Sequence, residues 1–360
     1  MNDTIMRSDE RAVFALRSLY RNYGYARFKM SRFEEYDLYV RNKDFLVSDE
    51  VITFTDHTGR LLALKPDVTL SIIKNTVDRP GAVQKVYYNE NVYRVDKGTH
   101  SFKEIMQAGL ECIGDLGSYE IAEVVLLAAK SLALIGEEYV LDLSHMGLVS
   151  AILQGLSAEQ QAEALAAVHQ KSVHALGEMN LSAEEQTKLT ALINCCGNPA
   201  EALATLKPYL TTEAELAAFA EFQSLCAILQ KDPHVRVDFS VGNDLKYYSG
   251  VVFKGYLEGI PAGVLSGGQY DKLLQKLGRR SGAIGFAVYL DMLERREEAE
   301  YDVDTVLLHG PEADPATLVE AAERLAEEGT LLVAKEAPEG VQFRRLLKLT
   351  ERGIEPVENG

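Results

Sequence analysis

Lys-Glu-Ile-Met-Gln-Ala-Gly-Leu-Glu-Cys-Ile-Gly, at residues 103–114, is the stretch whose pattern decides the fold. Its composition predicts a β-strand, and successive side chains of a strand point to opposite faces of the sheet. One face carries side chains that suit packing against a helix: Met106, Ala108, Leu110 and Cys112. The other face carries Gln107 and Glu111 with Gly109 between them, which leaves room for a small polar ligand. A solvent-facing strand of an antiparallel sheet has the same pattern, so this strand alone leaves both interpretations open.

Further polar segments precede and follow this strand. Asp67 and Thr69 lie at the start of a helix predicted over residues 71–75, where they either cap the helix or bind an ammonium group. Tyr247 and Tyr248 are adjacent on a predicted strand, which would place one ring on each face. The pair Gly267-Gly268 permits close approach of the backbone to a ligand or to a neighbouring strand. Taken singly, these patterns are typical of capping and packing.

The chain as a whole predicts an α+β fold. Apolar runs predict strands over residues 51–55, 60–64, 83–89, 103–113, 139–143, 236–241, 249–257, 264–266 and 283–287. Helical periodicity is found over residues 8–22, 120–134 and 290–297, and residues 146–230 form an Ala- and Leu-rich helical module. A sheet interrupted by a helical insertion is the simplest account of this order. The tail after residue 298 has the order strand, helix, strand, helix, with the last helix over residues 342–350.

Composition and charge limit the function classes. The 360-residue chain is 47% hydrophobic and 25% charged, as in ordinary globular proteins. Its net charge of −17 makes a broad nucleic-acid-binding surface unexpected, although a local basic pocket is compatible with it. The four cysteines contain no Cys-x-x-Cys pair, which indicates free thiols in a reducing compartment and no metal site. No apolar segment suits a signal peptide or a membrane span, so we expect a soluble, cytoplasmic protein.

Four segments, taken in order, resemble the catalytic core of a class II aminoacyl-tRNA synthetase, and specifically of histidyl-tRNA synthetase. They are residues 64–69 (Leu-Lys-Pro-Asp-Val-Thr), residues 92–111 (motif 2), residues 245–253 (the histidine-specific stretch), and residues 266–271 with 283–287 (the approach to motif 3). The resemblance covers about residues 8–298. It implies an antiparallel sheet flanked by helices in a core over residues 1–298, which contains a helical insertion over about 146–230. A small, truncated α/β region over residues 299–360 would follow.

The resemblance also implies a histidine-binding set. Its members are Asp67, Thr69, Arg94, Gln107, Glu111, Tyr247 and Tyr248. In the family, the residues matching Asp67, Thr69 and Gln107 hold the α-ammonium group, and those matching Glu111 and Tyr248 reach the imidazole. Asp67 is shorter than the family's Glu. Arg94 or a group from a partner chain is the candidate for the substrate carboxylate.

Departures from the family pattern remove the cations that adenylate formation needs. Asn243 and Met292 stand where the family has arginines, and Lys103 and Gln269 replace two more. Loss of one charge-stabilising donor typically lowers an enzyme's rate by about 10²–10³-fold. We therefore expect no catalytic residue, no cofactor and no aminoacylation from this chain, and Met292 is expected to pack in the core.

The regulatory subunits of ATP phosphoribosyltransferase are synthetase paralogues that combine these features. The resemblance to them implies a non-catalytic dimer that assembles with the short-form catalytic subunit into a hetero-octamer, activates that subunit and transmits feedback inhibition by histidine. No tRNA, membrane or metal partner is expected. A divergent histidyl-tRNA synthetase or related ligase, and a stand-alone amino-acid-binding dimer, are the alternatives.

Overall fold

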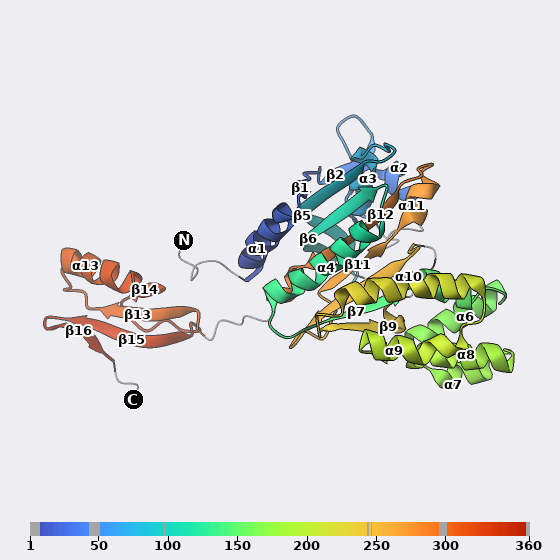
Figure 1. Ribbon diagram of the computed structural model, residues 1–360. Helices are drawn as coiled ribbons and strands as arrows, with labels where there is room; N and C mark the ends of the chain where they lie inside the picture. Colours follow the sequence, from blue (N-terminus) through green and yellow to red (C-terminus); the bar gives the residue numbers. More distant parts are fainter. Residues whose placement is uncertain are drawn as a thin grey trace. The chain divides into compact units, whose positions relative to one another are not determined.

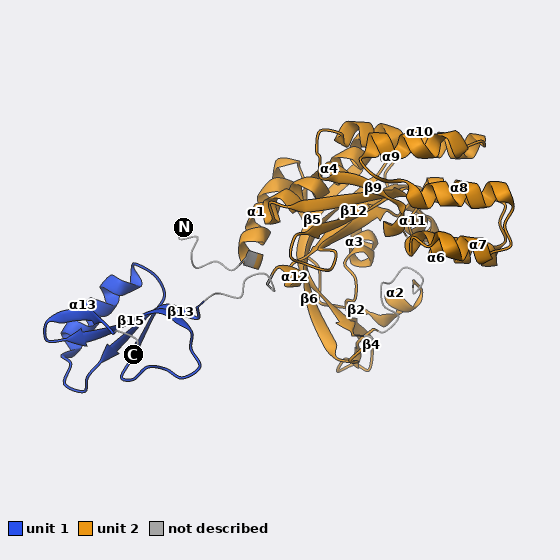
Figure 2. Cartoon of the chain, turned by 90° about the horizontal axis from the view of Figure 1, so that it is seen from below, with its two compact units in different colours: residues 1–7, 297–360 blue, residues 8–296 orange. Residues whose placement is uncertain are grey.

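The computed structural model describes residues 8–42, 51–96, 98–242, 245, 247–294 and 301–357. Asn243, one of the positions at which the sequence departs from the family pattern, lies outside these residues. One compact unit spans Ser8–Arg296, and residues 301–357 belong to a second unit (Figure 2). The two units divide between Arg296 and Glu297, two residues before the boundary expected from the sequence.

A large mixed sheet forms the centre of the first unit (Figure 1). In the described part of the chain its strand order is β1 (Ala26–Arg27), β5 (Val83–Val95), β6 (Phe102–Gly114), β12 (Gly282–Tyr289), β11 (Leu265–Gln269), β10 (Val251–Leu257), β7 (Tyr139–His145), β9 (Val235–Asp238) and β8 (Cys196–Gly197). Neighbours are antiparallel except for the pairs β1·β5 and β7·β9. The α+β class predicted from the sequence is therefore confirmed.

Helices cover both faces of this sheet. Helices α1 (Ser8–Asn22) and α4 (Ser118–Ile135) pack on the face to which Ala108, Leu110 and Cys112 point, as predicted. Helices α3 (Thr69–Asn75) and α11 (Asp271–Lys276) pack with side chains of β5 and β12 in a second apolar cluster. Because Gln107 and Glu111 alternate with the α4-facing residues, their side chains leave the sheet away from α4.

Smaller elements complete the first unit. A three-stranded sheet has the order β2 (Phe33–Glu35), β4 (Leu61–Leu64) and β3 (Thr53–Thr55), and helix α2 (Tyr36–Val40) follows β2. Strands β3 and β4 form the predicted hairpin, in which Asp56 accepts the backbone N–H groups of Thr58 and Arg60. Helix α12 (Asp291–Glu294) is short.

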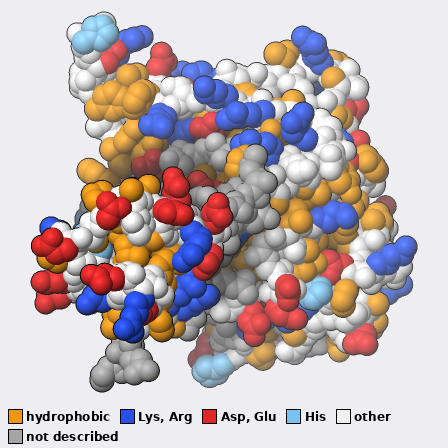
Figure 3. All heavy atoms as spheres, turned by 90° about the vertical axis from the view of Figure 1, so that its left-hand side faces the viewer, with side chains coloured by type: hydrophobic (Ala, Val, Ile, Leu, Met, Phe, Trp, Pro, Cys, Tyr) orange, Lys and Arg blue, Asp and Glu red, His pale blue; other side chains and the backbone are white. Residues whose placement is uncertain are grey.

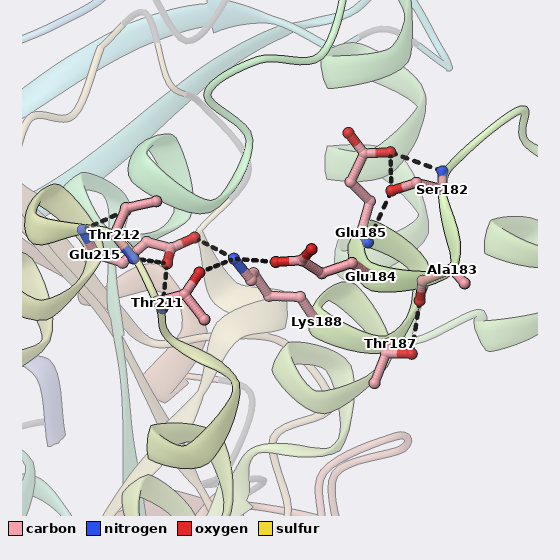
Figure 4. Close-up of polar contacts among 9 residues, drawn as sticks. All are labelled: Ser182, Ala183, Glu184, Glu185, Thr187, Lys188, Thr211, Thr212 and Glu215. Atoms are coloured by element: carbon pink, nitrogen blue, oxygen red, sulfur yellow. Dashed lines mark hydrogen bonds and ion pairs between the residues drawn. The ribbon is translucent and has the colours of Figure 1, made fainter.

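The insertion between β7 and β9 is helical, as predicted, apart from the two residues of β8. It contains α5 (Met146–Ile152), α6 (Ala158–His169), α7 (Val173–Glu178), α8 (Ala183–Asn194), α9 (Pro199–Leu206), the 3₁₀ turn η2 (Lys207–Tyr209) and α10 (Glu213–Leu229), and a second 3₁₀ turn, η3 (Phe239–Val241), follows β9. A buried ion pair joins α8 to α10, with Lys188 Nζ 2.7 Å from Glu215 Oε1 (Figure 4). Glu215 also accepts the backbone N–H groups of Thr211 and Thr212, which fixes the start of α10.

The second unit has a four-stranded sheet in the order β14 (Leu331–Ala334), β13 (Val303–His309), β15 (Phe343–Thr350) and β16 (Gly353–Pro356), packed by helix α13 (Pro315–Ala326). The helix predicted over residues 342–350 is wrong, because this segment is strand β15. It pairs in parallel with β13, and its alternating Leu347 and Leu349 pack against the same small core as α13. Apolar side chains spaced two residues apart are typical of a strand in a sheet that has one covered face. The segment forms a strand and not a helix because β13 is available to pair with it.

Candidate functional site

A cavity of about 400 Å³ lies over strands β6, β11 and β12 on the face away from α4. All seven residues of the predicted histidine-binding set line it: Asp67, Thr69, Arg94, Gln107, Glu111, Tyr247 and Tyr248. The residues come from segments up to about 180 positions apart, and the pairing of β6 with β12 and the packing of α3 bring them together. The strand pattern at residues 103–114 therefore marks a polar cavity, not a solvent-facing surface.

Glu111 lines this cavity and is 2% exposed. Its carboxylate accepts hydrogen bonds from the Thr69 hydroxyl at 2.9 Å and from the Tyr270 hydroxyl. Burial raises the pKa of Glu111 to about 8, although these two hydrogen bonds oppose the rise. A carboxyl group with such a pKa can be protonated or ionised near neutral pH, so it can pair with an N–H donor or with a cation.

A glycine opposite Glu111 makes room for this carboxylate. Gly285 of β12 is its direct partner across the sheet, and a Cβ atom at Gly285 would collide with Glu111 Oε2. The space above Gly109, which the sequence assigned to a ligand, is filled in a different way. The Tyr88 hydroxyl lies 2.6 Å from where a Gly109 Cβ would stand, and it donates a hydrogen bond to the Phe286 carbonyl at 3.4 Å.

Asp67 and Arg94 also line the cavity and interact electrostatically. Asp67 Oδ1 accepts the backbone N–H of Leu70 at 2.9 Å, so Asp67 both caps α3 and lines the cavity. Burial raises the pKa of Asp67, and the Arg94 guanidinium opposes that rise. The Arg94 Nε group donates to the Pro66 carbonyl at 3.1 Å, which ties the arginine to the loop that carries Asp67. A carboxylate and a guanidinium in one cavity suit a zwitterionic ligand.

Tyrosine rings form much of the remaining wall. Tyr247 and Tyr248 precede strand β10, so the prediction that a strand would place their rings on opposite faces is wrong. Their centroids are 4.7 Å apart, both rings line the cavity, and Tyr247 also lies 5.8 Å from Tyr270. The turn before β10 allows both rings to line the same cavity. The Tyr248 ring packs over Gly268, and its nearest carbon is 2.8 Å from the position that a Cβ atom on that glycine would take.

Gln107 and Tyr289 face each other across strands β6 and β12 and both line the cavity. Gln107 is 3% exposed, so its amide is available to the cavity and not to bulk water. Burial raises the pKa of Tyr289, and the nearby Arg94 opposes the rise. Tyr88, Tyr270 and Tyr289 also line the cavity and were not among the predicted site residues. Tyr88 lies in the strand predicted over residues 83–89 and Tyr270 in the motif segment 266–271, whereas Tyr289 follows the strand predicted over residues 283–287.

Lys103, Gln269 and Met292, the described positions that lost an arginine, do not line the cavity. Met292 is partly buried against the main core, as predicted. Lys103 pairs with Asp96, and Gln269 donates to Asp271 Oδ2 at 2.7 Å. Among the described residues that line the cavity, Arg94 is the one Lys or Arg side chain.

On the face shown in Figure 3, Lys and Arg side chains are frequent along the upper part of the view, although the chain has a net charge of −17. None of the described helices is long and apolar enough to cross a membrane. Cys112, Cys195 and Cys226 are buried free thiols, and Cys196 is an exposed one.

The chain is similar to known proteins over most of its length. The histidyl-tRNA synthetase family profile matches residues 3–293. The ATP phosphoribosyltransferase regulatory subunit of Symbiobacterium thermophilum is 32% identical over 301 residues, which are 78% of this chain and 75% of the relative. The regulatory subunit of Moorella thermoacetica is 30% identical over 335 residues, which are 88% and 85% of the two chains.

Solved structures share the fold. A Bacillus halodurans protein described as an ATP phosphoribosyltransferase regulatory subunit/histidyl-tRNA synthetase has a TM-score of 0.73 at 23% identity, covering 97% of this chain and 96% of its own. A chain of the ATP phosphoribosyl transferase (HisG:HisZ) complex from Thermotoga maritima has a TM-score of 0.62 at 20% identity, covering 78% and 97%. The predicted synthetase-like fold is confirmed. Given the profile match and the two relatives at 30% identity or more, the chain belongs to the histidyl-tRNA synthetase-like family of ATP phosphoribosyltransferase regulatory subunits.

Proposed function

We propose that this chain is the subunit that senses histidine for a separate ATP phosphoribosyltransferase catalytic subunit. The observation that carries the proposal is the set of groups that line the 400 Å³ cavity: the Asp67 carboxylate, the Arg94 guanidinium and the buried Glu111. The ammonium and carboxylate groups of an amino acid can pair with Asp67 and Arg94. A basic, hydrogen-bonding side chain such as imidazole suits Glu111.

We assign the individual roles from the family resemblance. Asp67, Thr69 and Gln107 would surround the ammonium group, and the Arg94 guanidinium would face the carboxylate. Glu111, held by Thr69 and Tyr270, would accept an imidazole N–H, and the Tyr247 and Tyr248 rings would enclose the ring of the ligand. The bound histidine would replace water at buried polar groups, which strengthens each hydrogen bond.

A regulatory role without catalysis is supported by the shortage of cations. Transfer of an adenylyl group needs fixed positive charge against a phosphate chain, and the described cavity lining offers Arg94 alone. In place of catalysis we propose a regulatory assembly that has two states. In it, a dimer of this chain joins the short-form catalytic subunit to form a hetero-octamer. Histidine would bind one state better, with a coupling free energy on the order of 1–3 kcal/mol.

Calorimetric titration tests the proposal. Histidine should bind the purified chain, and its affinity should change when the catalytic subunit is added, since coupling between two sites is reciprocal. Histidinol, which lacks the carboxylate, and imidazole lactate, which lacks the ammonium group, should both bind more weakly. An absence of histidine binding, or an unchanged phosphoribosyltransferase activity on mixing the subunits, contradicts the proposal.

One assay distinguishes this proposal from a divergent histidyl-tRNA synthetase. Histidine-dependent exchange of pyrophosphate into ATP by the purified chain would favour a ligase. We expect no exchange, and none from the Asn243→Arg variant either, because Met292 still leaves the phosphate chain without its second arginine.

A further inference from the structure

Positive charge is concentrated in one short segment of this acidic chain. Residues 11–33 contain no Asp or Glu, whereas the whole chain has a net charge of −17. The basic residues of this segment are Arg11, Arg17, Arg21, Arg27, Lys29 and Arg32. The segment includes most of α1 and all of β1, and both elements contact strand β5 of the central sheet (Figure 1). Several of these cations are therefore brought to the β1 edge of the sheet.

Three of the arginines line one cavity, which we call the arginine pocket. Its volume is about 420 Å³, and its lining residues are Arg17, Arg21, Tyr25, Ala26, Arg27 and Tyr87. Arg17 and Arg21 are four positions apart on α1, so their side chains lie on the same face of the helix. Arg27 of β1 pairs with Tyr87 of β5, and the Tyr87 ring packs against α1. Arg27 therefore also points to the α1 side of the sheet.

The guanidinium groups of this pocket have no anionic partner in the described part of the chain. None of the three donates a hydrogen bond or forms an ion pair with a described residue, and no described residue that lines the pocket is acidic. Arg17 lies over the Phe14 ring at 5.2 Å, and its terminal nitrogens are accessible, unlike its buried Nε atom. Like charges four positions apart on a helix repel each other, so Arg17 and Arg21 favour a bound anion.

The lysine beside the pocket is arranged differently, because the chain supplies its partner. Lys85 Nζ is 2.5 Å from Glu123 Oε1, and the Tyr25 hydroxyl donates to the same oxygen atom at 3.3 Å. Tyr25 also lines the arginine pocket, so the paired lysine and the unpaired arginines lie close together. Glu123 is already balanced by Lys85, and no described carboxylate is placed to balance the arginines, which leaves the pocket open to an anion from solution.

The number and kind of these cations define the ligand. A single carboxylate would balance one of the three positive charges. A phosphate monoester carries about two negative charges near neutral pH, and a diphosphate group carries more. The guanidinium fork also matches the spacing of phosphate oxygens and forms charge-assisted hydrogen bonds with them. A diphosphate group therefore suits the pocket better than a carboxylate does.

We propose that the arginine pocket binds the diphosphate group of a small molecule, which is free pyrophosphate or the phosphate end of a nucleotide. Arg17 and Arg21 hold the group from α1, and Arg27 holds it from β1. Tyr25 and Tyr87 are 3% and 5% exposed, so neither ring offers a surface on which a base could stack. The phosphate groups therefore supply the binding energy, and the bound anion links α1 to the edge of the sheet.

Titration calorimetry on the full-length chain at low salt tests the site with pyrophosphate, ADP and adenosine. Pyrophosphate should bind, adenosine, which has no phosphate, should not bind, and added salt should weaken the binding of pyrophosphate. Binding of both pyrophosphate and ADP would identify the ligand as any diphosphate, nucleotides included, whereas binding of pyrophosphate alone would identify it as the free anion. Failure of pyrophosphate to bind would overturn the proposal.

Matched variants locate the binding. Arg17→Gln and Arg27→Gln should each weaken pyrophosphate binding about tenfold, through loss of a charge-assisted hydrogen bond. Lys29→Gln removes the same charge from the same segment, but Lys29 does not line the pocket, so this variant should bind as the wild type does. Pyrophosphate should also raise the Tm of the wild type and of Lys29→Gln more than that of Arg27→Gln. Equal weakening in all three variants would indicate a general attraction to surface charge and would overturn the proposal.

Two further measurements distinguish this site from other uses of the arginines. Pyrophosphate could also meet Arg94 in the 400 Å³ cavity proposed for histidine (the histidine cavity). Loss of pyrophosphate binding in Arg94→Gln but not in Arg27→Gln would assign the probe to that cavity. Sedimentation of Arg27→Gln shows whether the arginine joins protein chains, and a changed oligomeric state with unchanged pyrophosphate binding would assign the arginines to such a contact. Either result would overturn the proposal.

Discussion

At the scale of single residues, Glu111 sets the character of the histidine cavity. Burial removes water from its carboxylate, and two hydroxyl groups replace part of that hydration. Glu111, whose pKa is raised to about 8, can then take up or release a proton when a ligand enters. Asp67 acts differently, because its carboxylate also caps α3 and lies near the Arg94 guanidinium.

Glu111→Ala should weaken histidine binding by about 1–3 kcal/mol, through loss of a charge-assisted hydrogen bond to the imidazole. Titration calorimetry measures the change. Glu104→Ala is the matched control, since Glu104 is on the same strand but bonds to Asn91 and Tyr93 outside the cavity. An unchanged affinity in Glu111→Ala would place imidazole recognition elsewhere.

The raised pKa of Glu111 predicts a pH dependence of stability. Between about 4.5, its ordinary pKa, and about 8, the folded chain holds a proton at Glu111 that the unfolded chain has released. The free energy of unfolding without ligand should therefore fall as pH rises through this window. Denaturant unfolding at several pH values should show a shallower fall for Glu111→Gln, which has no proton to lose. Parallel pH profiles for the two proteins would contradict the raised pKa.

At the scale of elements, the pairing of β6 with β12 builds the site. The register places Glu111 opposite Gly285 and Gln107 opposite Tyr289, so one strand pair supplies both a polar group and the space for it. A shift of one residue would turn Gln107 and Glu111 into the α4-facing core. The helical core packed on the other face, with Leu110 and Cys112 fully buried, opposes such a shift.

Gly285→Ala should disturb this strand pair. The added methyl group would collide with Glu111 Oε2 and with the Leu110 carbonyl oxygen, so we expect a loss of about 1–3 kcal/mol in stability and weaker histidine binding. Gly310→Ala is the control, because no atom lies within 4 Å of a Cβ there. Thermal unfolding and calorimetry of both variants make the comparison. Equal behaviour of the two variants would show that Glu111 can move aside at little cost.

At the scale of the whole molecule, the two compact units have separate cores. The residues that line the histidine cavity all belong to Ser8–Arg296, and the second unit packs around Leu307, Ala321 and Leu325. The proposed histidine recognition and any role of the tail in assembly can therefore be tested separately.

A chain shortened to end at Arg296 should bind histidine with unchanged affinity, because every residue of the cavity is retained. Calorimetry measures the affinity, and circular dichroism checks that the shortened chain is folded. Activation of the catalytic subunit is a separate measurement on the same sample. A folded, shortened chain that no longer binds histidine would contradict the assignment of the site to the first unit.

Much of this protein could be predicted from its sequence. Alternation along residues 103–114 correctly assigned Leu110 to the core and Glu111 to a polar face, because strand geometry fixes which residues share a face. The composition of residues 146–230 indicated a helical insertion, since helical periodicity is a local property. All seven residues that the family motifs named line the cavity, because the types of residue needed to hold one ligand recur in one order.

Other features were decided by tertiary structure alone. Residues 343–350 became a strand because β13 offered an edge to pair with, and the rings of Tyr247 and Tyr248 came together because the chain turns before β10. The Tyr88 hydroxyl occupies the space above Gly109, and Tyr270, which is distant from Glu111 in the sequence, donates a hydrogen bond to it. The arginine pocket likewise exists only because α1 packs beside β1 and β5. Local patterns fix which way a side chain points, whereas the neighbour it meets depends on how distant segments pack.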